Sequence, residues 1–177
     1  MNRTGQRQGL GIVYRKDGYF ISIVNDTKTD WSGKLAFSHQ SIRGEMYDRF
    51  EQMITLPPFS QQLIPICFEK TRKDSFLYVE FGGAYDVYFY DMWKDKQFET
   101  DLTINKQVNG NIADVTIKAN EFARMVFIDL PDGILYDMED NYFDLPKGKQ
   151  RSIRIVADRE ISEQDITVKT FADEWCE

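Results

Sequence analysis

Val115-Thr116-Ile117-Lys118-Ala119 alternates apolar and polar residues, and Ser152-Ile153-Arg154-Ile155-Val156 repeats this pattern in the same half of the chain. Lys34-Leu35-Ala36-Phe37-Ser38 does the same nearer the N-terminus. A period of two places successive side chains on opposite faces of a strand, so that one face can be buried while the other meets water. These three stretches therefore predict half-buried β-strands in both halves of the chain.

Short apolar runs separated by turn residues continue through all 177 residues. Asp17-Gly18, Asn109-Gly110 and Asp132-Gly133 are turn signals, because these residues accept the positive φ that a tight reversal requires. We expect strands near 9–15, 19–25, 33–40, 49–55, 61–68, 75–80 and 85–91, and then near 99–107, 112–119, 122–130, 134–137, 150–157 and 164–171.

One segment, Gly44 to Met53, fits a short helix or a long bent strand about equally well. Met46, Phe50 and Met53 recur at helical spacing, but Tyr47 would lie on the opposite side of such a helix. Both interpretations stay open.

The number of short strands and the weak helix signal predict an all-β chain of two tandem immunoglobulin-like β-sandwich domains. We expect these domains at residues 1–97 and 98–177, with the boundary at the end of the charged run Trp93–Gln97. Residues 1–97 carry 13 Lys and Arg against 12 Asp and Glu, whereas residues 98–177 carry 9 against 17, within a net charge of −7. This shift in charge supports two units.

Charge and hydropathy argue against two classes of partner. No stretch approaches the roughly 18 consecutive apolar residues of a membrane span. Nucleic-acid binding needs a basic face, and the more basic half is close to neutral. We therefore expect neither a membrane nor a nucleic acid as partner.

Residues for catalysis or cofactor binding are scarce. The single histidine, His39, lacks the sequence context of a Ser-His-Asp or Cys-His arrangement, so a hydrogen-bonded or surface imidazole is expected. The 29 Asp and Glu residues leave a glycosidase-type carboxylate pair open by composition, but a thin sandwich rarely provides the cleft such a pair needs. We expect no cofactor and no catalytic residue in this chain.

Two candidate binding sites stand out. The acidic residues Asp137, Glu139 and Asp140 are crowded enough to supply oxygen ligands for calcium, although a structural edge loop is the favoured interpretation. Trp31, in a polar turn, and Tyr88 with Tyr90, on one strand face, are candidates for stacking on carbohydrate. Packing in the core or at a domain interface is the favoured alternative for these rings.

The most specific motif is Asp140-Asn141-Tyr142-Phe143-Asp144, which Leu145-Pro146-Lys147-Gly148 follows. It resembles the Ser-Asp-Asn-Tyr-Phe-Asp-Leu-Leu-Pro-Gly segment near the C-terminus of β-mannosidases of glycoside hydrolase family 2, except that Glu139 replaces the Ser and the Leu-Leu-Pro-Gly order is changed. Glu121 to Ile128 is similar to the preceding Phe-Ala-Arg-x-Val-x-Leu strand of that domain. Val24-Asn25-Asp26-Thr27 looks like a strand and turn of the immunoglobulin-like domain before it.

The resemblance implies that this chain is the non-catalytic C-terminal region of a larger glycosidase. Such a parent would cleave terminal β-D-mannosides with retention, using two Glu residues on a barrel of about 250 residues that this chain cannot contain. Its partners would be the catalytic and N-terminal domains of the same polypeptide, with a homodimer as a further possibility. A secreted, periplasmic or lysosome-like parent fits the sequons Asn2-Arg3-Thr4 and Asn25-Asp26-Thr27. The alternative is a carbohydrate-binding module or an adhesive sandwich protein that stands alone.

Overall fold

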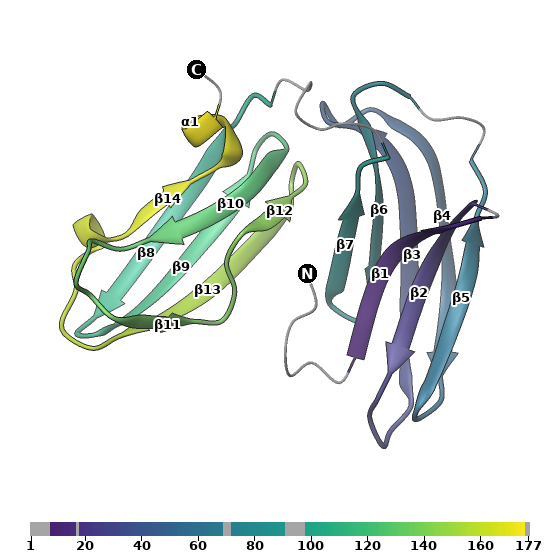
Figure 1. Cartoon of the computed structure of the whole chain (residues 1–177), viewed down its shortest axis with the longest axis horizontal. Coiled ribbons are helices and arrows are strands. Elements are labelled where there is room, and N and C mark those ends of the chain that lie inside the picture. Colours follow the sequence, from purple (N-terminus) through teal and green to yellow (C-terminus); the bar gives the residue numbers. More distant parts are fainter. Residues whose placement is uncertain (1–7, 17, 69–71, 91–97, 176–177) are drawn as a thin grey trace. The chain divides into compact units, whose positions relative to one another are not determined.

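The structure, a computed structural model, describes residues 8–16, 18–68, 72–90 and 98–175. It has two compact units (Figure 1), the first formed by Met1–Ser41 with Glu45–Lys96 and the second by Ile42–Gly44 with Gln97–Glu177. Asp17 and the charged run 93–97, on which two of the sequence expectations rest, lie outside the described residues.

The described residues of the first unit form seven antiparallel strands in two sheets. One sheet has the order β1-β2-β5 and the other the order β4-β3-β6-β7. The strands are β1 (Gln8–Arg15), β2 (Gly18–Asn25), β3 (Trp31–Ser41), β4 (Met46–Leu56), β5 (Ser60–Ile66), β6 (Ser75–Phe81) and β7 (Ala84–Tyr88).

The core of the first unit follows the predicted alternation. Ile21 and Ile23 of β2, and Leu35 and Phe37 of β3, are buried in one cluster, while Lys34 on β3 is exposed. Alternate positions of a strand face one side, so each sheet contributes one apolar face to this core.

The second unit also consists of two antiparallel sheets, ordered β11-β13-β9-β8 and β12-β10-β14. A 3-10 turn (Glu163–Asp165) and the short helix α1 (Phe171–Trp175) complete it. The strands are β8 (Leu102–Asn109), β9 (Ile112–Ala119), β10 (Ala123–Asp129), β11 (Tyr136–Met138), β12 (Phe143–Leu145), β13 (Gln150–Ala157) and β14 (Thr167–Lys169).

The two most regular stretches of the sequence form the centre of this second core. Val115 pairs with Ile153 and Ala113 with Ile155 in the β9–β13 ladder, so the apolar residues of both strands lie on the same face of the sheet. Val115, Ile117, Ile153 and Ile155 are almost fully buried, together with Val126 and Ile128 of the opposite sheet.

The prediction of an all-β chain is confirmed. The open segment Gly44 to Met53 resolves as a strand, because β4 pairs with β3 along its length and Phe50 stacks on Phe37 with ring centroids 5.0 Å apart. One detail differs from expectation: the last strand is shorter than 164–171 and is followed by α1. In the described part of the chain, no helix has the length and apolar character needed to cross a membrane.

Candidate functional site

The motif residues 140–144 lie beside an irregular stretch of β10. Ala123 pairs with Leu145 and Val126 with Phe143, so β10 has one residue more than β12 between these pairs. Such an extra residue is a β-bulge, which leaves backbone groups without ladder partners. Met125, inside the bulge, has φ of 48°.

Asp144 supplies the partners that the bulge requires. One carboxylate oxygen accepts a hydrogen bond from the Met125 backbone N–H at 2.9 Å, and the other forms an ion pair with the Arg124 guanidinium. The Asp144 and Arg124 side chains are 15% and 17% exposed. A charged acceptor so placed satisfies the free N–H and keeps both charges paired.

Asn141 extends the sheet where β12 has not yet begun. Its side-chain oxygen accepts from the Ile128 N–H at 2.8 Å, and its side-chain N–H donates to the Ile128 carbonyl at 3.0 Å. The amide thus imitates a strand neighbour of β10, since it offers one donor and one acceptor.

The other three motif residues, Asp140, Tyr142 and Phe143, also make contacts that hold the segment leading into β12. Asp140 forms an ion pair with Arg151, whose guanidinium lies 4.6 Å from the centre of the Phe143 ring. Phe143 is buried, and Tyr142 stacks on Phe127 with ring centroids 5.3 Å apart. Each of the five motif residues therefore has a structural contact in the second unit.

The acidic residues proposed for calcium are not gathered around one point. Asp137 and Glu139 are exposed, and Asp140 is directed to Arg151 instead. Among the residues that the structure describes, no three His, Cys, Asp or Glu side chains lie close enough to hold a metal ion.

Trp31 begins β3 and lies in the core instead of in an exposed turn. Its side chain is 8% exposed, and its ring centroid lies 4.5 Å from that of Phe81. Gly82 leaves the space that the indole occupies, because a Cβ at this position would overlap the ring. The faces of the Trp31 ring are used in packing, which is the alternative that the sequence analysis favoured over sugar stacking.

Tyr88 and Tyr90 are half-buried and pack against the first core. Their ring centroids lie 5.4 Å and 6.5 Å from that of Tyr19. The Tyr90 hydroxyl accepts from the Arg72 N–H at 2.7 Å and also contacts Ser75 and His39. These contacts match the packing role that was weighed against sugar stacking.

His39 is the centre of a polar cluster that the sequence did not reveal. It is fully buried, and its Nε2 atom lies 3.0 Å from both Ser75 Oγ and the Tyr90 hydroxyl. Its Nδ1 atom is 3.5 Å from an Asp48 carboxylate oxygen, beyond a good hydrogen bond, so this nitrogen has no hydrogen-bond partner. Burial lowers the pKa of His39, although Asp48 acts in the opposite direction.

This cluster has the residue types of a nucleophilic triad, but its serine is not accessible to a substrate. Ser75 is fully buried, and its hydroxyl donates to the Arg72 carbonyl at 2.7 Å. A nucleophile must reach its substrate, and the buried Ser75 hydroxyl cannot. The hydrogen bonds of Ser75 and Tyr90 to the Arg72 backbone instead hold this residue beside β6.

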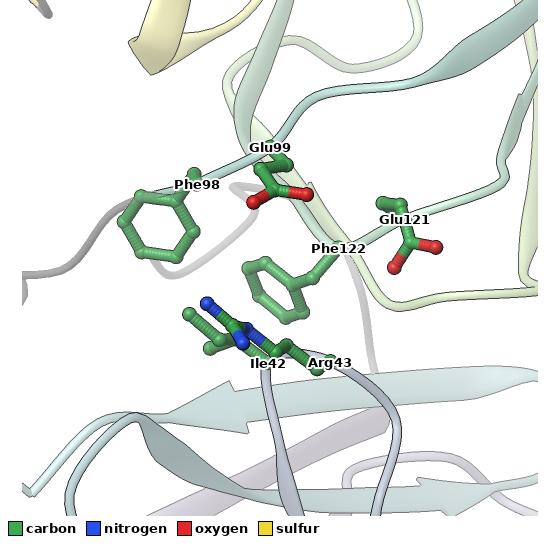
Figure 2. Close-up of a pocket in the computed structure, with 6 residues that line it drawn as sticks. All are labelled: Ile42, Arg43, Phe98, Glu99, Glu121 and Phe122. Atoms are coloured by element: carbon green, nitrogen blue, oxygen red, sulfur yellow. The ribbon is translucent and has the colours of Figure 1, made fainter.

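A small pocket of about 20 Å³ lies in the second unit (Figure 2). Two aromatic rings and two carboxylates are among the side chains that Figure 2 shows around it: Ile42, Arg43, Phe98, Glu99, Glu121 and Phe122. Space of this size holds about one water molecule, so it cannot enclose a sugar ring.

Comparison with known proteins shows what this architecture resembles. Residues 85–174 match the family Ig_mannosidase, an Ig-fold domain. A solved β-D-mannosidase from Dictyoglomus thermophilum matches 93% of this chain, with a TM-score of 0.80 at 20% identity. The exo-chitosanase CsxA of Amycolatopsis orientalis matches 91%, with a TM-score of 0.66 at 12% identity. No curated protein is significantly similar to the sequence.

Fold and matches together define a class of protein, that of the immunoglobulin-like β-sandwich regions, as the sequence predicts. The matched stretch is half of the chain, and the chain belongs to the mannosidase Ig-fold domain family. It spans 22% of the Dictyoglomus enzyme and 25% of the exo-chitosanase, so it corresponds to a minor part of either.

Proposed function

We propose that this chain is the non-catalytic C-terminal accessory region of a β-mannosidase-like enzyme of glycoside hydrolase family 2. The observation that carries the proposal is a match along 93% of this chain to 22% of a β-D-mannosidase, combined with membership of the mannosidase Ig-fold family. A (β/α)₈ barrel needs about 250 residues, so the catalytic machinery would lie elsewhere in a longer polypeptide.

The physical role in this proposal is to support the catalytic barrel. Two sandwich domains, at residues 1–97 and 98–177, would buttress the barrel or provide contacts between domains or subunits. Their partners would be the catalytic and N-terminal domains of the same polypeptide, and a homodimer is the alternative use of the same surfaces. The parent enzyme would hydrolyse terminal β-D-mannosides with retention.

Deletion of these residues from the longer polypeptide tests the supporting role. We expect the truncated enzyme to melt at a lower temperature and to lose mannosidase activity as it unfolds, because domain interfaces stabilise both partners. A deletion that leaves both the melting temperature and the activity of the enzyme unchanged would refute a buttressing role.

A further inference from the structure

The triplet Asn25-Asp26-Thr27 matches the acceptor pattern for N-glycosylation and lies where β2 ends in the first unit. Such a triplet normally indicates a surface loop, because an enzyme must reach the asparagine amide. The structure instead buries Asn25, which is 0% exposed. The acceptor amide is therefore closed to solvent in the folded chain.

The nitrogen of the Asn25 side chain is surrounded by backbone carbonyls. Nδ2 lies 2.9 Å from the Thr29 oxygen and 3.0 Å from the oxygens of both Leu56 and Pro57. An amide nitrogen carries two hydrogens, so three acceptors use its whole donor capacity. The reverse orientation of the amide would direct its oxygen at these carbonyls, so the contacts also determine which atom is the nitrogen.

The oxygen of the same amide is used by the third residue of the triplet. Asn25 Oδ1 accepts from the Thr27 N–H at 3.2 Å and from the Thr27 hydroxyl at 2.7 Å. The backbone contact is that of an Asx turn, in which a side chain takes the place of a backbone acceptor. The two groups that define the triplet, an amide and a hydroxyl, thus both have partners within the fold.

The Asn25 amide joins two sheets of the first unit. Asn25 ends β2 in one sheet, whereas Leu56, which is 31 residues later, ends β4 in the other. The hydrogen bond between them is buried. A buried carbonyl that loses its donor is costly, so we infer that this contact stabilises the end of the sandwich.

A glycan on this nitrogen is incompatible with these contacts. Glycan transfer forms a bond between Nδ2 and the anomeric carbon of a sugar, breaks the bond from that carbon to its diphosphate carrier, and releases one Nδ2 proton. A single hydrogen would then remain for three carbonyls. The sugar would also need space that a closely packed interior does not offer.

We propose that N-glycosylation of Asn25 and the native fold of the first unit are mutually exclusive. The triplet Asn25-Asp26-Thr27 is then a clamp between two sheets and gives no support to a secreted parent enzyme. This inference is independent of the accessory role, because a chain that stands alone would make the same contacts.

Hydrogen exchange of the side-chain amides, followed by NMR of the 177-residue protein, tests the closure. We expect the Nδ2 hydrogens of Asn25 to exchange about 100-fold more slowly than those of Asn105, which is exposed on β8. Equal exchange rates at the two asparagines would overturn the proposal.

Asn25→Asp tests the clamp, because it keeps an oxygen acceptor for Thr27 and removes both donor hydrogens. The equilibrium constant for folding should fall by at least about tenfold in urea denaturation, since buried carbonyls lose their donor. Asn105→Asp makes the same change at an exposed position and should alter this constant by about twofold or less. Equal effects of the two substitutions would contradict the clamp.

Secretion of the full chain from a eukaryotic host, which attaches glycans to nascent chains, tests the exclusion itself. Gln107→Thr is the matched control, because it completes an acceptor triplet at Asn105 and both positions are exposed. We expect mass spectrometry of the folded product to find a glycan at Asn105 of this variant and an unmodified Asn25.

A glycan at Asn25 that is confined to retained, protease-sensitive material would support the proposal. A secreted product that carries a glycan at Asn25 and keeps the melting temperature of the unglycosylated protein would overturn it. Either result leaves the accessory role untouched, so failure of one proposal is distinguishable from failure of the other.

Discussion

Asp144 shows how one side chain decides whether an irregular strand is stable. It accepts the Met125 N–H and pairs with Arg124, and both charged side chains are largely removed from water. A partly buried charge needs its partner, because the charge left behind is poorly solvated.

We therefore predict that Asp144→Asn lowers the free energy of unfolding of the second unit by about 2 kcal/mol in urea denaturation. Arg159→Gln is the control, because Arg159 is 58% exposed and binds Asp158 at the surface. It should cost less than about 0.5 kcal/mol. Equal effects of the two substitutions would contradict the role given to Asp144.

Gly82 and Gly83 differ in what surrounds them, although both have positive φ, of 57° and 84°. A Cβ at Gly82 would overlap the Trp31 indole, whereas one at Gly83 would meet nothing within 4 Å. Gly82→Ala should destabilise the first unit by about 3 kcal/mol, from overpacking and backbone strain together. Gly83→Ala should cost only about 1 kcal/mol. Urea unfolding curves of the pair would contradict this if the order were reversed.

His39 makes the stability of the first unit depend on pH. Its pKa is lowered by burial, so the folded state prefers the neutral imidazole. The stabilisation from this group is present above the unfolded pKa of about 6.5 and is lost as the pH falls through the folded value.

Because the chain has one histidine, a single imidazole titration in the NMR spectrum reports on it. We expect a midpoint below about 6.5. We also expect the difference in melting temperature, His39→Gln minus the unmodified protein, to increase as the pH is lowered from 7 to 5. A midpoint above the ordinary histidine value would refute this account.

These residue-scale contacts lay largely beyond sequence analysis. Ser75 and Tyr90 stand 36 and 51 residues from His39, and no local pattern brings them together. The polar neighbours of Trp31, Asp30 and Ser32, left both sugar stacking and packing open, and the space beside Gly82 shows that the ring is packed in the core. The family motif was recognised, whereas its partners Arg124 and Arg151 became evident only from the fold.

At the scale of the elements, alternation predicted strands well wherever turns bounded them. Strands β9 and β13 have the predicted bounds, 112–119 and 150–157. The bounds of β12 could not be predicted, because it has three residues and follows the polar Asp140-Asn141, which resembles a turn. The segment of β4 was ambiguous because Met46, Phe50 and Met53 recur at helical spacing. It forms a strand because its backbone pairs with β3.

Asp86 connects two elements that belong to different sheets. Its carboxylate accepts from the Ile12 N–H of β1 at 2.7 Å, while its own strand, β7, pairs with β6. Burial raises the pKa of Asp86, although the Ile12 and Val87 backbone N–H groups oppose this shift. An inward-directed charge at a sheet edge also discourages pairing with other chains.

Asp86→Ala should lower the free energy of unfolding by about 1 to 2 kcal/mol, because the Ile12 N–H loses its acceptor. Asp86→Asn keeps an acceptor and removes the charge. A raised carboxyl pKa gives stability below about pH 4 that is lost as the pH rises through the folded value. The stability of Asp86→Asn relative to the unmodified protein should therefore increase from pH 4 to pH 7. A difference that is flat over this range would contradict the raised pKa.

At the scale of the whole molecule, the chain is two sandwich units that belong to the mannosidase Ig-fold domain family, and we propose that they are part of a larger glycosidase. The match to a β-D-mannosidase extends over 93% of this chain but only 22% of that enzyme. The family was predictable because the motif at 140–144 is specific. The supporting role itself depends on surfaces of the parent enzyme and is therefore a proposal.

The most direct test of this accessory role is the size of the native polypeptide, measured by immunoblot of the source organism with an antibody raised against this chain. We predict a band several times larger than 20.8 kDa, and β-mannosidase activity in the material that the antibody captures. A single band at the mass of this chain would contradict the account, because the sandwiches would then have no catalytic barrel to support.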